Sequence, residues 1–418
     1  MKIAIVGGGL VGGLAAVSMA RALSHQPEVS IDVFERFPRP EQDSLSYQEQ
    51  YNARNLVLSS ATAAFLEDMA LWENLKHLLV PIKSLKVSRL HGLGHSTIES
   101  QDEGVNALGY VADMALLAKA IATFAEAETA VNYHYSAEIK SIKPKNAGYQ
   151  LAFSTPDICT DYDLVMVADG QKSWVCDALG IASDNASYGQ HALVTNVTLT
   201  EDVAPVAYEQ FIPGGALTLL PLTQSGFNRR MALVWIDSEA KLKELESMPE
   251  SQFLQELSQR LSLDAEYVEK GNSQIYPLNY QLRHERVRPH LVIIGNAAQS
   301  LHPIAAQGFN LAVRDVRDFI QMTLLHLENN NKELFSGAWM AQFSAQRQAD
   351  VSKVSGFVST LTKVFFKSSA MPIRGFLQDF ALAGFELIPG AKRALSQFAM
   401  GGQKKSGRIF RERGVRGE

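Results

Sequence analysis

KIAIVGGGLVGG, residues 2–13, carries a short apolar strand directly into a run of glycines. Gly7, Gly9 and Gly12 fit the spacing G-x-G-x-x-G of dinucleotide-binding proteins. In that motif the first glycine makes a tight turn, the second lets the backbone approach a pyrophosphate, and the third lets the next helix pack on its strand. The stretch therefore predicts a Rossmann-type unit with a pyrophosphate held by these three glycines.

The residues that follow complete such a unit. A helix is predicted over Leu14–Leu23, with its positive N-terminal end at the phosphates. A second apolar strand, Ser30–Phe34, ends at Glu35, where a carboxylate can accept hydrogen bonds from a ribose. Arg36 beside it also suits a 2′-phosphate, so this unit alone leaves NAD(P) and FAD open.

A second stretch, GNAAQSLHPIAAQGFNLAVRD at residues 295–315, decides between the two cofactors. It follows an apolar strand, Leu291–Ile294, and its small residues and amides let a backbone approach a flat cofactor. A nicotinamide-binding domain has no use for such an element, so FAD is the predicted cofactor and NAD(P)H a transient co-substrate. Gln307, Gly308 and Phe309 are predicted to begin a helix whose N–H groups and dipole stabilise the negative charge of a reduced flavin.

The composition restricts the function further. The 418 residues suit two domains or slightly more, and the net charge of −5 gives no reason to expect nucleic acid as a partner. Cys159 and Cys176 stand outside any C-x-x-C pair, which indicates a reducing compartment, and the ten histidines show no metal-ligand spacing. The N-terminus lacks the pattern of a signal peptide, and no apolar stretch is long enough to cross a bilayer. We therefore expect no metal, and a cytoplasmic protein that is soluble or peripheral on the cytoplasmic face of the membrane.

Periodicity along the chain predicts alternating helices and strands. Helical spacing appears over Ala61–Leu79, Met114–Ala127 and Glu239–Leu261, and the segment from Ala192 to Ile236 is rich in strand formers. Further strands are predicted over Leu85–Leu90, Ser96–Ser100, Val131–Tyr135, Ala137–Lys143, Tyr149–Ser154 and Leu164–Val167. The pattern predicts an α/β fold in which a β-rich block interrupts the dinucleotide-binding unit and covers the cofactor.

The predicted domain boundaries follow this alternation. The Rossmann-type FAD-binding domain is discontinuous, with residues 1–78, 108–178 and 276–345. The inserted β-sheet substrate domain takes residues 79–107 and 179–275, and residues 346–418 form a C-terminal helical region with a basic tail.

Three pieces of the chain resemble the sequence marks of the class A flavoprotein monooxygenases, the p-hydroxybenzoate hydroxylase-like group: residues 7–12, Ala168-Asp169-Gly170 and residues 295–315. Within that group the chain resembles the ubiquinone-biosynthesis hydroxylases, most closely their 2-octaprenyl-6-methoxyphenol hydroxylase branch. The segments that carry this likeness are residues 108–111, 188–191, 219–222 and 296–303. The similarity extends over about the whole chain.

The resemblance implies a p-hydroxybenzoate hydroxylase-like fold and hydroxylation of a polyprenylated phenol, of 2-polyprenyl-6-methoxyphenol type, in ubiquinone biosynthesis. NAD(P)H would reduce the flavin, and dioxygen would add to give a flavin hydroperoxide that attacks an electron-rich ring carbon. The partners are then the polyprenylphenol and dioxygen, while a complex with other ubiquinone-biosynthesis proteins and a homo-oligomer stay open. Two alternatives also stay open: a hydroxylase of a small soluble aromatic, and a non-catalytic flavoprotein scaffold of a biosynthetic complex.

The resemblance also assigns roles to single residues. Arg54 is expected near the FAD pyrophosphate or ribityl chain, and Asp169 is expected to contact both FAD and the passing nicotinamide. His302, directly before Pro303, is the titratable candidate near the reactive ring edge, where it could assist phenol deprotonation. The predicted catalytic residues are His302, Gln307 and Gly308, and the predicted cofactor contacts are Gly7, Gly9, Gly12, Glu35, Arg54, Asp169, Gly170, Asn296, Pro303, Gln307, Gly308, Phe309 and Asn310.

At three positions the chain departs from the family's usual residues. Asn296 stands where the wider group has an Asp that faces the ribityl chain, although the octaprenyl-methoxyphenol branch resembles this chain in carrying Asn. Ala306 stands where Gly is usual, so its methyl group is expected either to tighten the loop or to shift a positive-φ geometry that Ala tolerates poorly. Asn52 stands where Asp is common.

Two apolar helix faces are expected towards the C-terminus. One consists of Ile373, Phe376, Leu377 and Phe380 and the other of Phe357, Val358, Leu361, Val364 and Phe365, and the tail after Pro389 is basic. An apolar helix with a basic tail suits peripheral contact with anionic lipid. The alternative is a helix packed on the protein's own core with a solvated tail.

Overall fold

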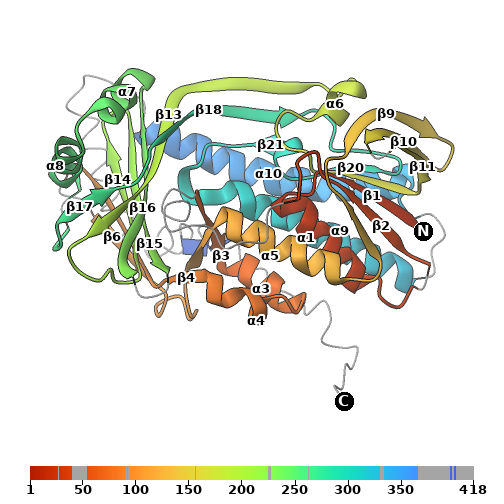
Figure 1. Ribbon diagram of the computed structural model, residues 1–418, viewed down its shortest axis with the longest axis horizontal. Helices are drawn as coiled ribbons and strands as arrows, with labels where there is room; N and C mark the ends of the chain where they lie inside the picture. Colours follow the sequence, from red (N-terminus) through yellow and green to blue (C-terminus); the bar gives the residue numbers. More distant parts are fainter. Residues whose placement is uncertain are drawn as a thin grey trace, which may run out of the picture.

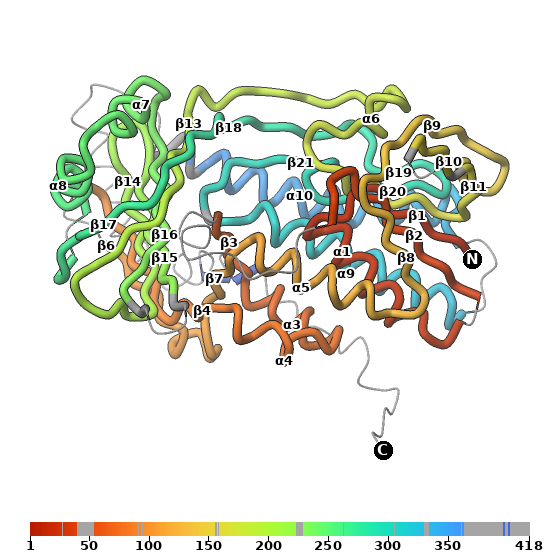
Figure 2. Tube along the Cα trace, viewed as in Figure 1, coloured from red at the N-terminus to blue at the C-terminus, as the bar shows by residue number. Residues whose placement is uncertain are grey.

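The computed structural model describes residues 1–26, 28–39, 54–90, 92, 95–155, 157–224, 227–261, 263–329, 334–365, 396–397 and 400–401. The molecule is elongated and has two lobes, one with a mostly parallel sheet and helices and one with a large, mostly antiparallel sheet (Figure 1). Two long strands, β13 (Ser183–Leu199) and β18 (Gln274–Arg283), pair with each other and run between the lobes (Figure 2).

Six strands form the sheet of the first lobe, in the order β19-β20-β12-β1-β2-β8. Their bounds are Val287–Arg288 for β19, Leu291–Ile293 for β20, Leu164–Val167 for β12, Lys2–Val6 for β1, Ser30–Phe34 for β2 and Val131–His134 for β8. All neighbours pair in parallel except β19 and β20. The order confirms the predicted Rossmann-type unit and places the distal strand β20 beside β12, next but one to β1.

Both faces of this sheet are covered, which explains its continuous apolar strands. Along β1, Ile3 and Ile5 pack with the helices α1 (Leu10–Ala22), α5 (Met114–Ala127) and α9 (Gln307–Glu328). Ala4 and Val6 point the other way, towards a three-stranded antiparallel sheet. That sheet consists of β9 (Glu138–Lys145), β10 (Gly148–Thr155) and β11 (Asp157–Tyr162).

The second lobe is built on a nine-stranded sheet. Its order is β21-β18-β13-β16-β15-β14-β5-β6, and β17 pairs with β13 beside this path. The further bounds are Gln299–Ser300 for β21, Phe227–Asp237 for β16, Gly215–Gln224 for β15, Val206–Ile212 for β14, Ser84–Arg89 for β5, His95–Glu99 for β6 and Tyr267–Lys270 for β17. Two helices, α7 (Glu239–Ser247) and α8 (Glu250–Arg260), pack on its outer face around Trp235.

A small antiparallel sheet and several shorter or C-terminal helices complete the fold. The sheet contains β3 (Asn55–Ser59), β7 (Gly109–Asp113) and β4 (Leu79–Ile82) in that order. The helices are α3 (Ser60–Asp68), α4 (Trp72–Leu75), α6 (Trp174–Ala178), α10 (Gly337–Phe365) and the short 3-10 turns η1 (Lys76–Leu78), η2 (Gly295–Ala297) and η3 (Ile304–Ala306).

Several predicted elements need correction. The single helix expected over Ala61–Leu79 is wrong, because a left-handed residue, Ala70 (φ 55°), ends α3 and the segment finishes in β4. The helix expected over Glu239–Leu261 is interrupted, with Pro249 between α7 and α8. The predicted boundaries near residues 276 and 346 fall inside β18 and α10, so the division into domains stays a prediction.

Only some of the residues predicted to form apolar helix faces near the C-terminus are among the described residues. Val358 is 1% exposed and packs with Ile304 and Leu311, so this part of the upstream apolar face is core, which favours the alternative given above. Ile373, Phe376, Leu377, Phe380 and the basic residues after Pro389 lie outside the described residues. No helix in the described part of the chain is long and apolar enough to span a membrane.

Candidate active site

Three segments that are distant in the sequence meet at one edge of the parallel sheet. Because β1, β12 and β20 are neighbours, their carboxyl ends bring together the turns that begin at Gly7, Ala168 and Gly295. A Cβ built on Gly7 would lie 2.5 Å from the Ala168 carbonyl oxygen, and one on Gly295 would lie 3.2 Å from Val11. Ligands of open α/β sheets bind at such an edge.

The glycine turn after β1 leaves room for a ligand. Gly7 has a φ of +102°, and a Cβ on Gly12 would lie 1.8 Å from the Gly7 carbonyl oxygen, so both positions require glycine. At Gly9 an added Cβ would meet nothing within 4 Å. Helix α1 begins directly after Gly9, at Leu10 and not at Leu14, and no side chain caps it. Its first N–H groups are therefore available to a phosphate.

Glu35 stands at the end of β2 beside this turn. One of its carboxylate oxygens accepts a hydrogen bond from the Gly8 N–H at 2.8 Å and the other accepts one from the Phe37 N–H at 2.9 Å. Tyr133 donates to the Gly8 carbonyl oxygen at 2.5 Å. The carboxylate is thus fixed where a ribose is expected, and its remaining lone pairs can accept from hydroxyl groups.

The turn after β12 presents an acceptor without a partner. Asp169 Oδ2 accepts from the Val175 N–H at 3.4 Å, whereas its Oδ1 is buried and has no partner among the described residues. Burial raises the pKa of this carboxyl group. The next residue, Gly170, has a φ of +88° and nothing within 4 Å of an added Cβ. A ligand hydroxyl or amide would satisfy the oxygen that the protein leaves unbonded.

The distal stretch forms η2, β21, η3 and the start of α9. In η2 the side chain of Asn296 is exposed while its neighbours Gly295 and Ala297 are buried. Ala306 has a φ of +50°, so the methyl group does not shift the backbone out of the left-handed region, which is strained for alanine. No side chain caps α9, and an added Cβ on Gly308 would meet nothing within 4 Å. The N–H groups at this helix end thus face open space, as an anionic flavin edge would require.

Asn310 has a structural role that the sequence did not predict. Its Oδ1 accepts from the Ser59 N–H and from the Thr62 hydroxyl, both at 2.8 Å. Its Nδ2 donates to the carbonyl oxygens of Val57 and Ala306, at 2.9 and 2.8 Å. These four bonds use the whole amide, so the side chain fastens α9 to β3 and α3 and is not available to the cofactor.

The amino-acid sequence matches the family model described as FAD binding domain over residues 1–336. The chain belongs to the FAD binding domain family. It is 26% identical over 407 residues to 3-demethoxyubiquinol 3-hydroxylase of Escherichia coli strain K12, covering 96% of this chain and 98% of that protein. It is 27% identical over 403 residues to ubiquinone hydroxylase UbiL of Rhodospirillum rubrum, covering 96% and 89%. The fold is similar to that of p-nitrophenol 4-monooxygenase PnpA from Pseudomonas putida DLL-E4, with a TM-score of 0.75, 15% identity and coverage of 96% and 98%.

The protein is accordingly an FAD-dependent monooxygenase, and the predicted family, fold and cofactor are confirmed. NAD(P)H is the co-substrate typical of this class. The glycine turn, the unbonded Asp169 oxygen and the uncapped start of α9 fit FAD, although the role of each predicted residue stays a prediction.

His302 of this flavoenzyme is held in a way that disfavours the predicted role as a base. Its Nδ1 accepts from the Ile304 N–H at 3.2 Å, and its Nε2 lies 3.3 Å from Gln190 Oε1. The ring is 1% exposed and packs edge-on against Tyr188, and burial lowers the pKa of His302 to about 4. The bond from Ile304 uses the lone pair that a base needs, which favours a loop-positioning role.

Arg54 and Gln307 occupy different surroundings. The Arg54 guanidinium lies 5.1 Å from the centre of the Tyr276 ring, between the small sheet and the large one, and the residue is exposed. Gln307 is buried, and its Oε1 accepts from Arg314 at 3.1 Å. Arg314 therefore orients the first side chain of α9.

Proposed function

We propose that this monooxygenase hydroxylates a polyprenylated phenol, of 2-polyprenyl-6-methoxyphenol type, in ubiquinone biosynthesis. The observation that carries the proposal is the apolar inner face of the large sheet, which lies against the flavin loop. Two relatives over nearly the full chain are named as ubiquinone-pathway hydroxylases, which supports the same substrate class.

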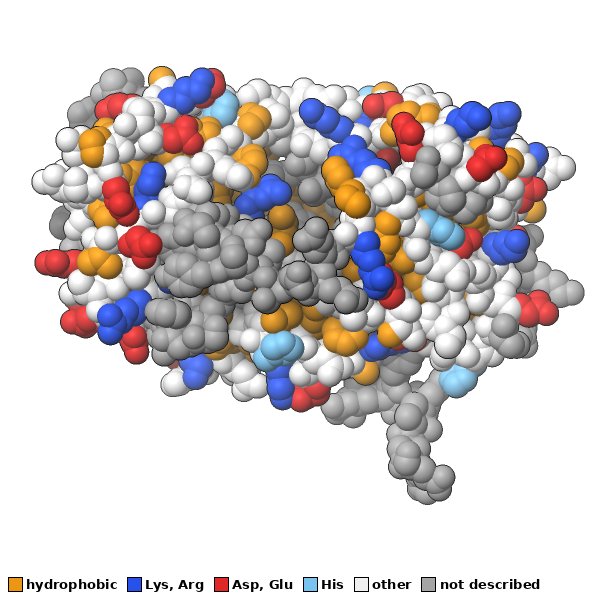
Figure 3. Space-filling view, in the orientation of Figure 1, with side chains coloured by type: hydrophobic (Ala, Val, Ile, Leu, Met, Phe, Trp, Pro, Cys, Tyr) orange, Lys and Arg blue, Asp and Glu red, His pale blue; other side chains and the backbone are white. Residues whose placement is uncertain are grey.

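The inner face of the large sheet packs against the flavin loop. Phe211 and Ala216 contact Ile304 and Leu311, while Ala207 packs with the small sheet around Val111. Hydrophobic side chains also gather on the surface between the two lobes (Figure 3). A substrate ring with an apolar tail would bury its surface in such a setting.

The division of labour follows from these positions. When bound, FAD supplies the redox chemistry that activates dioxygen once the nicotinamide has reduced it. The glycine turn and Glu35 bind the adenosine diphosphate part, and the start of α9 stabilises negative charge at the flavin. His302 and Gln190 hold the loop against the sheet, and the apolar inner face orients the ring and excludes water.

The test is NAD(P)H-dependent oxygen consumption by the FAD-loaded protein, with product analysis by mass spectrometry. A prenylated methoxyphenol in detergent is compared with the same ring lacking the prenyl chain. We expect stimulation and a hydroxylated product with the prenylated ring, at a KM at least tenfold lower than that of the short ring. Equal use of both rings would indicate a soluble aromatic substrate, and the absence of any phenol-stimulated oxidation would indicate a scaffold.

A further inference from the structure

Glu209 is a carboxyl group in the middle of the inner face of the large sheet. It lies on β14, where it pairs with Val87 of β5 and Thr218 of β15. Residues paired in this way point to the same face. Val87 is buried in the cluster that contains Ile304 of the flavin loop. The carboxyl group therefore points towards the same side of the sheet as the flavin loop.

On the same face of β14, Glu209 lies between Ala207 and Phe211. Ala207 belongs to the apolar cluster around the small sheet, and Phe211 belongs to the cluster around Ile304 and Leu311. Both side chains are buried, whereas Glu209 between them is half-buried. Glu209 therefore keeps part of its surface accessible between two buried neighbours.

Only one of the two Glu209 oxygens is bonded. The Thr218 hydroxyl donates to Oε2 at 2.6 Å, and no donor among the described residues reaches Oε1. Burial raises the pKa of Glu209 to about 7, with the bond from Thr218 acting in the opposite direction. A carboxyl group in apolar surroundings costs free energy unless it is paired, so a half-buried one with an oxygen left unbonded by the described residues indicates a ligand contact.

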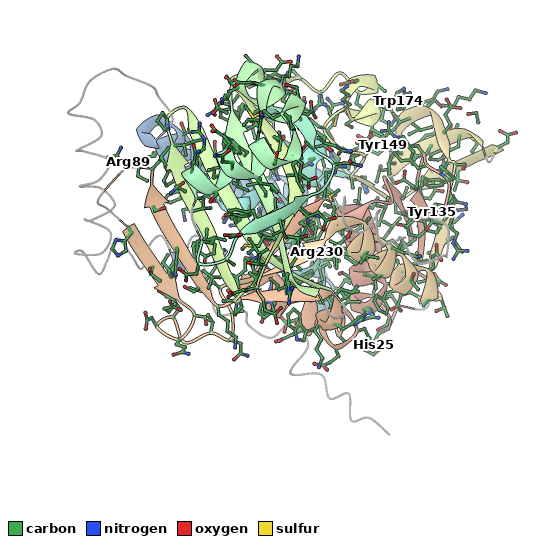
Figure 4. All side chains as sticks on the ribbon, turned by 60° about the vertical axis from the view of Figure 1, so that its left-hand side comes forward. His25, Arg89, Tyr135, Tyr149, Trp174 and Arg230 are labelled. Atoms are coloured by element: carbon green, nitrogen blue, oxygen red, sulfur yellow. The ribbon has the colours of Figure 1, made fainter. Side chains whose placement is uncertain are left out.

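No cation neutralises this carboxyl group within the described residues. Arg89 pairs with Phe211 and Arg230 pairs with Leu222, so both belong to the face of the sheet that carries Glu209, and they lie well apart from each other in Figure 4. Neither arginine acts on the pKa of Glu209, which only burial and the Thr218 bond shift. The facing segments also carry titratable groups: His302 and Arg54 have the contacts described above, and Arg314 of α9 pairs with Asp350 of α10. The residues that the structure describes thus leave Oε1 open to a hydroxyl group or amine of a ligand.

We propose that Glu209 binds the hydroxyl group of the aromatic substrate and accepts its proton. This assignment rests on the proposed function, because it takes a phenol as the substrate. The phenol O–H bond breaks, its proton passes to Oε1 and its electron pair stays on the ring oxygen. That oxygen then donates electron density into the ring, which favours attack by an electrophilic oxygen at the ortho and para carbons. Thr218 holds Oε2 and so directs Oε1 at the substrate.

The central variant is Glu209→Gln, which keeps the shape and an oxygen for Thr218 but cannot accept a proton. The matched control is Glu99→Gln, because Glu99 also accepts from a hydroxyl group, that of Ser84 at 2.8 Å, at a pair on the opposite face of the same sheet. With the phenol that the wild type uses best, the ratio kcat/KM is measured from pH 5.5 to 9, together with hydrogen peroxide release. Phenol binding is measured separately by the change it causes in the flavin absorbance.

For Glu209→Gln we expect a normal content of FAD, a fall in the hydroxylation kcat of about a hundredfold and loss of the acidic limb of the pH profile. Oxygen consumption should turn from hydroxylated product to hydrogen peroxide, and phenol should bind at least tenfold more weakly. Glu99→Gln should behave as the wild type. A Glu209→Gln enzyme with the wild-type kcat/KM and an unchanged acidic limb would overturn the assignment.

Thr218→Val keeps the assignment testable if Glu209→Gln does not retain FAD. Losing the Thr218 bond raises the pKa of Glu209 further, so the acidic limb should move to higher pH while the protein stays folded; an unmoved limb would overturn the proposal. The failure of the proposed function is distinguishable from this one. If the wild type hydroxylates only a short phenol, the proposal of a prenylated substrate fails, and Glu209 can still be tested with that short phenol. If the wild type binds no phenol at all, the proposed function and the role of Glu209 both fail.

Discussion

Replacement of Arg347 by Met should reveal how much the flavin loop depends on a buried charge cluster. Arg347 of α10 is 1% exposed. Its guanidinium contacts Asp315 Oδ1, Asp318 Oδ2 and Asp350 Oδ2, each at 2.8 Å. The other oxygen of Asp315 accepts from the Gly295 N–H at 3.2 Å and from Gln299 at 3.1 Å. The cluster therefore connects α10 with the Gly295 turn, where the distal flavin motif begins.

The magnitude follows from the burial of the partners. Removing one partner of a buried ion pair costs about 3–5 kcal/mol, because a desolvated charge is left behind. Asp315 is fully buried, but Arg286 lies 3.5 Å from it, and Arg317 lies 2.7 Å from Asp318. These two arginines compensate part of the loss, so we expect about 3 kcal/mol, at the lower end of the range. Lys241→Met, which breaks an exposed pair with Glu244, should cost less than about 1 kcal/mol.

Urea unfolding of the FAD-free proteins, followed by tryptophan fluorescence, measures these differences. The release of FAD is followed separately by flavin fluorescence, and Arg347→Met should release it faster because the Gly295 turn loses its support. If Arg347→Met lowers the free energy of unfolding by less than about 1 kcal/mol at an unchanged m-value, the cluster does not stabilise the loop and this reasoning fails.

Three further predictions use single positions of the flavin site. Gly9→Val should abolish FAD binding and leave the fold intact, because the space beside Gly9 is empty of protein and its φ of −71° suits valine; a yellow variant with stoichiometric FAD would contradict the phosphate assignment. Ala306→Gly should raise the free energy of unfolding by about 0.5–1 kcal/mol, since relief of a left-handed alanine outweighs the entropy of glycine; a less stable variant in urea would show that the methyl group is needed. His302→Gln should flatten the pH dependence of stability between about pH 6.5 and pH 4. There the unfolded chain binds a proton that the buried imidazole of the native state rejects, so the wild type loses up to about 3 kcal/mol as the pH falls, and equal slopes for both proteins would refute the buried neutral state.

The sequence was sufficient where local chemistry decides the structure. The glycines after β1 are required by contacts within a few residues of chain and by one neighbouring strand, so their spacing alone indicates the turn. The single helix expected over Ala61–Leu79 failed because the chain turns at Ala70 into the short helices α4 and η1 and then pairs with β7 from Leu79 on, a contact that periodicity cannot anticipate.

The site was predictable in its backbone and much less so in its side chains. Asn310 was expected at the cofactor, but its amide is bonded to β3, to Thr62 of α3 and to the Ala306 carbonyl oxygen, and β3 itself was not predicted. Glu209 gave no sign in the sequence, since Tyr208, Glu209 and Gln210 are all polar or amphipathic. Only the pairing with Val87 and Thr218 shows which of the three faces the flavin loop.

The distal motif has a second function that explains its length. It leaves the parallel sheet at β20, makes η2, joins the large sheet as β21 beside β18, and enters α9 through η3. One continuous segment thus belongs to the sheet that holds the cofactor and to the sheet that carries Glu209. Gln299 of β21 is bonded to Asp315 and to Arg286, so the same buried cluster sets the position of both sheets relative to α9. Because hydroxylation requires the flavin and the ring at a fixed separation, damage to this cluster should lower the yield of hydroxylated product per NAD(P)H oxidised before it abolishes FAD binding.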